Sequence, residues 1–303
     1  MYDILIIGSG PAGLTTAIYS SRNDLKTCII AGTMWGGQLM LTTDVENYPG
    51  FKEGIQGPDL MSEMLKQAER FGAEIIFEDA TLVNFSSKPF KIKTSNKIHN
   101  TKSVIIATGT YAKRLGLESE DRLWGKGVSA CATCDALFFK DKDAVVVGGG
   151  DTAMEEALVL SRFAKNVSIV HRRDKLRASK ILQKRVLDNP KINIIWNSIV
   201  KEILGKEKVE GIRLNNIDLN EEGNLPCDAV FLAIGHKPNT DIFKGQIYLD
   251  EHGYIVAKDQ TKTSVDGIFV AGDAQDYLYR QAITAAGSGC KAAIDADRYL
   301  QNL

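Results

Sequence analysis

ILIIGSGPAG, residues 4–13, joins four apolar residues to a cluster of three glycines. Residues 14–21 carry apolar side chains at helical spacing, so the stretch predicts a strand, a glycine turn and a helix. In that setting a G-x-G-x-x-G pattern binds a dinucleotide, because the glycines admit the pyrophosphate and the helix N-terminus offers free N–H groups. A single pattern of this kind is a weak signal.

A second copy follows about 140 residues further on. The apolar run 144–147 leads into GGGDTA, residues 148–153, and a helix is expected from about Met154. Alanine is tolerated at the sixth position of the pattern. Two copies, each between a strand and a helix, outweigh the alternative of two tight turns that bind nothing. The sequence therefore predicts an α/β protein with two Rossmann-like, three-layer nucleotide-binding domains.

The end of the next strand distinguishes the two sites. About 23 residues after Gly148, the strand 167–170 runs into HRRD, residues 171–174, with Arg177 one helical turn beyond. An NAD site carries an acid at this point, whereas guanidinium groups bind a 2′-phosphate through charge-assisted hydrogen bonds. The second site is therefore predicted to bind NADPH, the alternative being an ordinary solvated basic surface.

The first site has neither an acid nor a base at the corresponding place. Its strand 27–30 ends in Ala31-Gly32, and the loop 33–38 is the candidate for close approach to a ribose. A dinucleotide other than NADPH is expected there, and FAD is the natural choice. Two buried-strand patterns, 105–109 and 231–235, end in glycine, and a third, 267–273, ends in Asp273. Asp273 is expected to bind a ribityl hydroxyl or, alternatively, to cap a turn; a helix from about Gln281 would direct its positive end there.

CATCD, residues 131–135, is the most chemically informative motif. Two cysteines separated by two residues can close a small disulfide, and beside a hydride source they indicate redox chemistry. The alternative is half of a zinc site, which requires four ligands. The other cysteines, Cys28, Cys227 and Cys290, stand singly and the four histidines form no ligand-spaced pair, so no metal site is expected.

The order of the motifs predicts how the domains are arranged. The first nucleotide fold begins the chain, the second occupies its middle, and the acidic strand at 267–273 returns near the end. We therefore expect a discontinuous FAD domain of residues 1–111 and 242–303, with an NADPH domain of residues 112–241 inserted and carrying the CxxC motif. Turn-forming linkers at 110–116 and 236–240 permit relative rotation of the domains. Residues 88–99 predict a short hairpin.

Composition excludes several classes of protein. The 303 residues are 44% hydrophobic, enough for about two domains. A formal net charge of −1 argues against binding nucleic acid or a membrane surface, and no apolar stretch approaches the ~18 to 20 residues of a membrane helix. The N-terminus predicts no signal peptide, and the scattered cysteines in apolar contexts fit a reducing cytoplasm.

Together these residues resemble the low-molecular-weight, bacterial-type thioredoxin reductases of the class II pyridine nucleotide-disulfide oxidoreductases. The resemblance covers essentially the whole chain. It also includes GGQL at 36–39, ENYPG at 46–50, GHKPNT at 235–240 and YRQA at 279–282. Ala136 and the pair Asp151-Thr152 are mild departures from the family pattern.

The resemblance implies a homodimer and a thioredoxin or thioredoxin-like protein disulfide as partner. It implies that Cys134 faces the flavin and Cys131 attacks the partner, with Asp135 as general acid; the alternative for Asp135 is a helix cap. Expected FAD contacts are Gly8, Ser9, Gly10, Pro11, Ala12, Gly13, Ala31, Gly32, Gly36, Gly37, Gln38, Asn47, Thr108, Gly109, Gly272, Asp273, Arg280, Gln281 and Ala282. Expected NADPH contacts are Gly148, Gly150, Asp151, Thr152, His171, Arg172, Arg173, Arg177 and His236.

Three other functions fit parts of this pattern. The flavoprotein component of an alkyl hydroperoxide reductase, which serves a peroxiredoxin, shares the core but carries a further N-terminal disulfide domain. A ferredoxin–NADP reductase of similar fold lacks the dithiol, so Cys131 and Cys134 argue against it. A redox sensor would bind nucleotides and use the cysteine pair as a switch without turnover.

Overall fold

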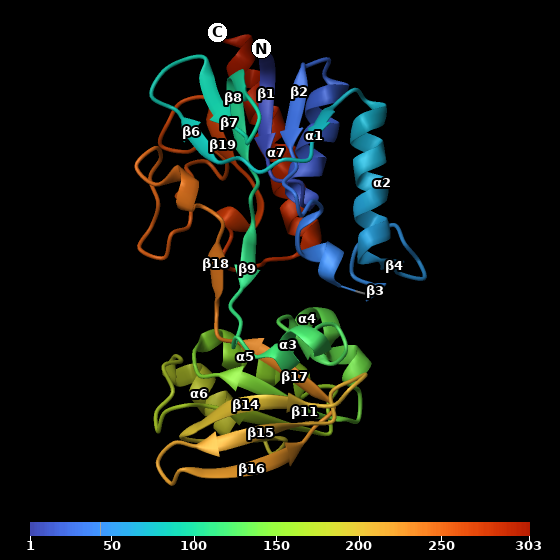
Figure 1. Cartoon of the computed structure of the whole chain (residues 1–303), viewed down its shortest axis with the longest axis vertical. Coiled ribbons are helices and arrows are strands. Elements are labelled where there is room, and N and C mark those ends of the chain that lie inside the picture. The colour runs from blue at the N-terminus through green and yellow to red at the C-terminus, as the bar shows by residue number, and fades with distance from the viewer. Residues whose placement is uncertain (43) are drawn as a thin grey trace. The chain divides into compact units, whose positions relative to one another are not determined.

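The computed structural model describes residues 1–42 and 44–303 and divides into two compact units (Figure 1). Unit 1 contains residues 1–111 and 237–303, and unit 2 contains residues 112–236. The second boundary thus falls five residues before the predicted one at 241. Asn239 accounts for the difference, since its backbone N–H donates to Gly109 O and its side chain to Thr108 O, both at 3.0 Å within unit 1.

Unit 1 is built on a seven-stranded sheet of order β5-β2-β1-β8-β7-β6, with β19 paired to β8 as a branch. The strands β1, β2, β5, β8 and β19 are parallel, and β6 and β7 are antiparallel additions. The predicted hairpin at 88–99 is present as β7 and the first part of β8. The bounds are β1 (Tyr2–Ile7), β2 (Thr27–Ile30), β5 (Glu74–Ile76), β6 (Leu82–Asn84), β7 (Phe90–Lys93), β8 (Ile98–Ile106) and β19 (Ile268–Val270).

Both faces of this sheet are covered at β1 and β2, which explains why these two strands are apolar with little alternation. Ile4 and Ile6 pack into a core with the helices α1 (Pro11–Arg22), α2 (Gly57–Arg70) and α7 (Ala282–Gln301). Leu5 and Ile7 point to the opposite face, where a second core holds loop residues such as Ile247. Alternate residues of one strand therefore serve two layers.

Unit 2 contains a parallel sheet of order β10-β17-β11-β12-β13 and a separate antiparallel sheet of order β14-β15-β16. Val146 packs with the helices, and Val145 and Val147 pack with the antiparallel sheet. The antiparallel sheet was not predicted. The bounds are β10 (Val128–Ser129), β11 (Asp143–Gly148), β12 (Asn166–Val170), β13 (Ile192–Ile195), β14 (Ser198–Leu204), β15 (Gly211–Asn216), β16 (Glu221–Pro226), β17 (Ala229–Ala233), α3 (Glu118–Leu123), α4 (Ala132–Asp135), α5 (Asp151–Leu160) and α6 (Lys180–Leu187).

The remaining elements are short. They are β3 (Asp44–Val45), β4 (Ile55–Gln56), β9 (Thr110–Ala112), β18 (His236–Pro238) and the 3₁₀ helices η1 (Gly37–Leu41), η2 (Ala136–Phe139), η3 (Asp241–Phe243) and η4 (Gly272–Ala274). Among the described residues, no helix is both long and apolar enough to cross a membrane.

The two parallel sheets share the strand order that positions a nucleotide. In each, the strand order reverses between the first strand and its later neighbour, β1 beside β8 and β11 beside β17. Ligands of such sheets bind in the crevice beyond the carboxyl ends of the strands at this reversal. Both glycine turns lie there, and α5 begins at Asp151, three residues before the predicted start at Met154.

Candidate functional site

The glycine turn of unit 1 is shaped by close packing on two sides and open space between them. Gly8 has φ +108°, and a Cβ on it would overlap the carbonyl oxygen of Ala107. A Cβ on Gly13 would overlap the carbonyl oxygen of Gly8, whereas Gly10 has open space around it. Gly10 precedes α1, whose first turn has no side-chain cap. The free N–H groups of that turn fit an anionic pyrophosphate.

Ser9 positions the loop that was predicted to lie against a ribose. Its buried hydroxyl donates to Ala31 O at 2.7 Å and accepts from Gly36 N at 2.9 Å. The same loop is held by Asp79, which accepts from the backbone N and the hydroxyl of Thr33 at 3.0 and 2.9 Å. Asp79 was missed because it follows β5 outside any motif.

Several predicted FAD contacts converge within unit 1. Gln38 Nε2 donates to Thr110 O at 3.0 Å, and Asn47 Nδ2 donates to Gln281 Oε1 at 3.3 Å. The hydroxyl oxygen of Thr108 is buried without a hydrogen-bond partner among the described residues. An orphaned buried hydroxyl at the end of β8 fits a polar ligand that this chain does not itself supply.

Asp273, at the end of β19, has an unusual carboxyl group. Burial raises its pKa to about 7, the charge of Asp276 adds to the rise, and Arg280 opposes it. No hydrogen bond is made by this carboxyl in the part of the chain that the structure describes, so it does not cap a turn. A half-buried acid that makes no hydrogen bond among the described residues fits the hydroxyl groups of a bound FAD.

The raised pKa of Asp273 predicts that the free energy of unfolding of the cofactor-free protein depends on pH. Between pH 5 and 7 the unfolded chain ionises this carboxyl and the folded chain does not, so stability falls as pH rises. Replacing Asp273 with asparagine should remove that fall. The free energy of unfolding of Asp273→Asn relative to wild type, measured in urea, should therefore rise by roughly 2 kcal/mol between pH 5 and pH 8. Exposed Asp266→Asn is the control, and equal pH slopes for Asp273→Asn and wild type would contradict the prediction.

The glycine turn of unit 2 repeats the first in its geometry. A Cβ on Gly148 would overlap the carbonyl oxygen of Ala233, and Gly150 has open space before an uncapped α5. A Cβ on Gly149 would overlap the ring of His171. The turn therefore offers the same free N–H groups to a second pyrophosphate.

Two predicted NADPH contacts, His171 and Asp151, connect this turn to neighbouring segments of the chain. His171 is only 6% exposed, and its Nε2 lies 2.9 Å from Lys175 O. Asp151 accepts from Ser179 N at 2.7 Å, which connects the start of α5 to the start of α6. These internal contacts leave their predicted contact with NADPH untested, and it stays a prediction.

The three predicted arginines lie on the exposed segment between β12 and α6. Arg172, Arg173 and Arg177 are all exposed, and within residues 1–42 and 44–303 none of them forms an ion pair. Arg177 N donates to Gly149 O at 2.8 Å, so this basic segment is fixed directly to the glycine turn. Such cations beside a pyrophosphate site fit a 2′-phosphate.

The CxxC motif forms a disulfide. Cys131 and Cys134 are bonded, with Cα atoms 5.3 Å apart. Cys131 precedes α4 and is half-buried, whereas Cys134 lies within α4 and is exposed. The Thr133 hydroxyl donates to Cys131 Sγ at 3.3 Å. Leu137 and Phe138, which follow on η2, are exposed apolar side chains beside the disulfide.

Two of the other cysteines have the character of core residues. Burial raises the pKa of the Cys28 and Cys227 thiols to about 12, so both remain neutral thiols near pH 7. Cys290 on α7 is half-buried.

Asp135 follows the disulfide and does not act as a helix cap. Burial raises the pKa of its carboxyl, and the polar side chain of Ser129 opposes the rise. No side-chain cap forms at the start of η2, where Asp135 stands. A carboxyl held toward its neutral form beside a dithiol is chemically suited to donate a proton.

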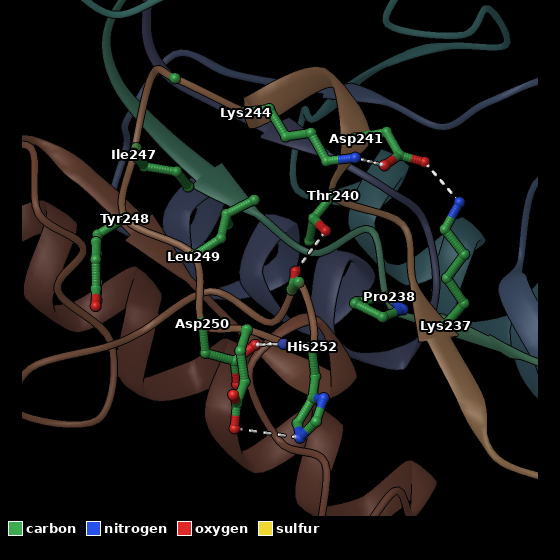
Figure 2. Close-up of a pocket in the computed structure, with 13 residues that line it drawn as sticks. Lys237, Pro238, Thr240, Asp241, Lys244, Ile247, Tyr248, Leu249, Asp250 and His252 are labelled. Carbon is green, nitrogen blue, oxygen red and sulfur yellow. Dashed lines mark hydrogen bonds and ion pairs between the residues drawn. The ribbon is translucent and has the colours of Figure 1, made fainter.

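Unit 1 also has a cavity of about 470 Å³, lined by residues between 237 and 253 (Figure 2). Its charged side chains bind one another: Asp241 accepts from Lys237 at 2.8 Å and from Lys244 at 2.6 Å. Asp250 accepts from His252 N at 2.8 Å. None of the predicted site residues lines this cavity, and its lysine, Asp241, Glu251 and His252 side chains are already paired.

Comparison with known proteins relates these features to a family. The family model described as pyridine nucleotide-disulphide oxidoreductase matches residues 2–289. The thioredoxin reductase of Streptomyces coelicolor is 53% identical over 304 residues, covering 99% of this chain and 94% of that protein. That of Rickettsia conorii is 53% identical over 302 residues, covering 98% and 97%.

Solved structures give the same relationship. Thioredoxin reductase from Giardia duodenalis matches with a TM-score of 0.94 at 47% identity and covers 99% of both chains. Thioredoxin reductase from Streptococcus pyogenes matches with a TM-score of 0.95 at 42% identity, covering 100% of this chain and 99% of that one.

Proposed function

Because the chain belongs to the pyridine nucleotide-disulphide oxidoreductase family, we propose that it reduces the disulfide of thioredoxin or a thioredoxin-like protein with electrons from NADPH. The observation that carries the proposal is the Cys131–Cys134 disulfide. It lies in the same unit as a glycine turn flanked by three exposed arginines.

Two cofactors complete this proposal. FAD, when bound in unit 1, supplies the two-electron chemistry that links hydride donation by NADPH to disulfide reduction. The open Gly10, the orphaned Thr108 hydroxyl and the half-buried Asp273 carboxyl support its binding there. In unit 2, Gly150 and the arginines support binding of the pyrophosphate and the 2′-phosphate of NADPH.

Once reduced, the dithiol acts by exchange. The Cys131 thiolate attacks one sulfur of the partner's disulfide; a mixed disulfide forms, the partner's S–S bond breaks, and the leaving sulfur takes a proton from Asp135. The Cys134 thiol returns a proton to Asp135, attacks Cys131 Sγ and expels the second partner sulfur, which takes a proton from solvent. Two electrons pass from the chain's dithiol to the partner. The Thr133 hydroxyl, 3.3 Å from Cys131 Sγ, stabilises the attacking thiolate.

This cycle has consequences for the whole molecule. The dithiol lies in unit 2 and the proposed FAD contacts in unit 1, so the units change orientation as the dithiol meets first the flavin and then the partner. We further propose a homodimer, which light scattering tests, and a cytoplasmic location.

The decisive assay is NADPH-driven reduction of thioredoxin-like proteins, followed by loss of NADPH absorbance in the protein reconstituted with FAD. Catalytic turnover supports a reductase. A single stoichiometric reduction without turnover would favour a redox sensor. A strong preference for a peroxiredoxin's disulfide would favour the peroxide-reducing alternative.

The role of Asp135 as the proton donor makes a separate prediction. Asp135→Asn cannot protonate the leaving sulfur, so reduction of the partner should slow about 10²-fold. Hydride transfer from NADPH should be unchanged, because that step precedes exchange. Stopped-flow absorbance separates the two half-reactions, and exposed Asp141→Asn in the same unit is the control. Slowing of both half-reactions to the same extent would assign Asp135 a structural role.

A further inference from the structure

The middle residue of each glycine turn lies against the residue that follows the next parallel strand. In unit 1 these residues are Ser9 and Ala31. In unit 2 they are Gly149 and His171. The residue after the strand donates its backbone N–H to the last residue of the neighbouring strand, β5 or β13, at 2.8 Å from Ala31 and at 2.9 Å from His171. The two pairs therefore occupy equivalent positions in the two folds.

The two units fill this position with opposite choices of large and small side chain. In unit 1 the turn supplies the side chain, since Ser9 Oγ donates to Ala31 O at 2.7 Å and accepts from Gly36 N at 2.9 Å. In unit 2 the strand end supplies it. A Cβ on Gly149 would stand 2.2 Å from Nδ1 and Cε1 of the His171 ring. The G-x-G pattern does not itself require glycine at this middle position, so its presence follows from the size of His171.

His171 also holds the basic segment that follows it. Its buried ring has Nε2 2.9 Å from Lys175 O, and because a carbonyl oxygen only accepts, Nε2 carries the hydrogen. The ring meets Trp196, the residue after β13, edge to face with centroids 6.2 Å apart. The segment returns to the turn at Arg177, whose N–H donates to Gly149 O at 2.8 Å. One ring thus contacts the turn, the basic segment and the end of β13.

These contacts occupy the imidazole. Its Nδ1–Cε1–Nε2 edge lies against Gly149, and its Nε2 hydrogen is used by Lys175 O. The next two residues, Arg172 and Arg173, are exposed, and so is Arg177. The guanidinium groups, rather than the ring, are therefore the groups available to a 2′-phosphate.

We propose that His171 is a positioning residue for NADPH, whose ring fixes the three arginines relative to the pyrophosphate turn. The inference rests on the proposed use of NADPH. It gives His171 no direct contact with the nucleotide, in place of the contact that the motif predicts. The bond to Lys175 O and the packing against Gly149 keep the segment in one shape before the nucleotide binds. The arginines then lose less conformational freedom on binding a 2′-phosphate.

The first experiment measures nucleotide binding without turnover. In the full chain with FAD bound, calorimetry gives the Kd of NADP⁺ and of NAD⁺, which lacks the 2′-phosphate. His171→Ala should weaken NADP⁺ binding about tenfold, the worth of one charge-assisted hydrogen bond, and NAD⁺ binding by less than about twofold. An equal loss with both nucleotides would make His171 a support of the turn alone and would overturn the inference. Equal affinity of wild type for both would instead count against the proposed use of NADPH.

The second experiment separates positioning from direct contact. When Arg172, Arg173 and Arg177 are all replaced by alanine, His171→Ala should have no further effect on the Kd of NADP⁺, since it acts through those side chains. A loss that persists in this background would mean that the ring binds the nucleotide itself. That result would overturn the inference and leave the proposed function standing.

The arrangement of unit 1 provides a rescue. The double variant Gly149→Ser, His171→Ala copies the pair Ser9 and Ala31, in which the hydroxyl connects the turn to the strand end. It should bind NADP⁺ about threefold more tightly than His171→Ala alone. Gly149→Ser alone should weaken binding, because its Cβ would overlap the ring. Wild-type affinity in Gly149→Ser, with no rescue in the double variant, would show that the two positions are not coupled.

His99→Ala is the matched control for loss of a buried histidine. His99 lies on β8 in unit 1, outside both glycine turns, and its Nε2 is 3.4 Å from the Thr94 hydroxyl. The control should keep the wild-type Kd for both nucleotides. If it weakened NADP⁺ binding as much as His171→Ala does, loss of a buried ring would explain both results and the inference would fail.

Discussion

Cys134→Ser is expected to lose about 10³-fold or more of NADPH-driven partner reduction and to accumulate a covalent complex with the partner. Without the Cys134 thiol, no group in the motif can resolve the mixed disulfide formed by Cys131. Non-reducing electrophoresis and mass spectrometry measure the trapped species, with a single-cysteine partner whose thiol is first joined to a small thiol as a mixed disulfide; the Cys131 thiolate attacks the partner's sulfur and the small thiol leaves.

Cys131→Ser should lose turnover equally and yet trap nothing. The remaining Cys134 thiol is the one that the family resemblance directs to the flavin. The pair of variants therefore tests the separate roles of the two sulfurs as well as the need for both. Trapping by Cys131→Ser and none by Cys134→Ser would reverse the assigned roles.

Cys290→Ser is the matched control for these substitutions. Cys290 is half-buried on α7 in unit 1 and takes no part in the disulfide. It should keep turnover within about twofold of wild type, as expected for a change outside the site. Retained turnover in Cys131→Ser or Cys134→Ser would contradict the proposed relay.

The sequence predicted the parts of this site that depend on local backbone geometry. The turn at Gly8–Gly13 requires glycine at its start, because Gly8 has a positive φ and packs against Ala107. A residue type that the local backbone requires in this way is visible in the sequence as a motif. The strand at 27–30 was predicted with its observed bounds, because a parallel strand buried on both faces is uniformly apolar.

Side chains whose roles depend on distant contacts were not predictable in the same way. Asp79 belongs to no recognisable pattern and matters only because folding brings it to Thr33. The antiparallel sheet β14–β16 includes a strand, Glu221–Pro226, that is mostly polar and exposed, so hydrophobic periodicity gives no signal for it. His171 belongs to a motif, but its burial against Gly149 depends on the tertiary structure and could not be predicted from the motif.

Nucleotide selectivity should depend on the exposed basic segment. The triple variant Arg172→Ala, Arg173→Ala and Arg177→Ala is expected to lower kcat/KM for NADPH about 10³-fold, because two or three charge-assisted hydrogen bonds to the 2′-phosphate are lost. With NADH, which has no 2′-phosphate, kcat/KM should change by less than about threefold. Steady-state kinetics with both nucleotides measure the ratio.

Exposed Arg185→Ala on α6 removes one positive charge from the same unit away from the glycine turn, and it should leave the ratio unchanged. Salt provides an independent test of the mechanism, since exposed charges are screened over about 8 Å at physiological ionic strength. Raising ionic strength should therefore erode the NADPH preference of wild type and leave the triple variant nearly unaffected. An equal loss with NADPH and NADH would mean that the arginines bind a part shared by both nucleotides. No loss with either would make this segment the solvated basic surface that the sequence alone could not exclude.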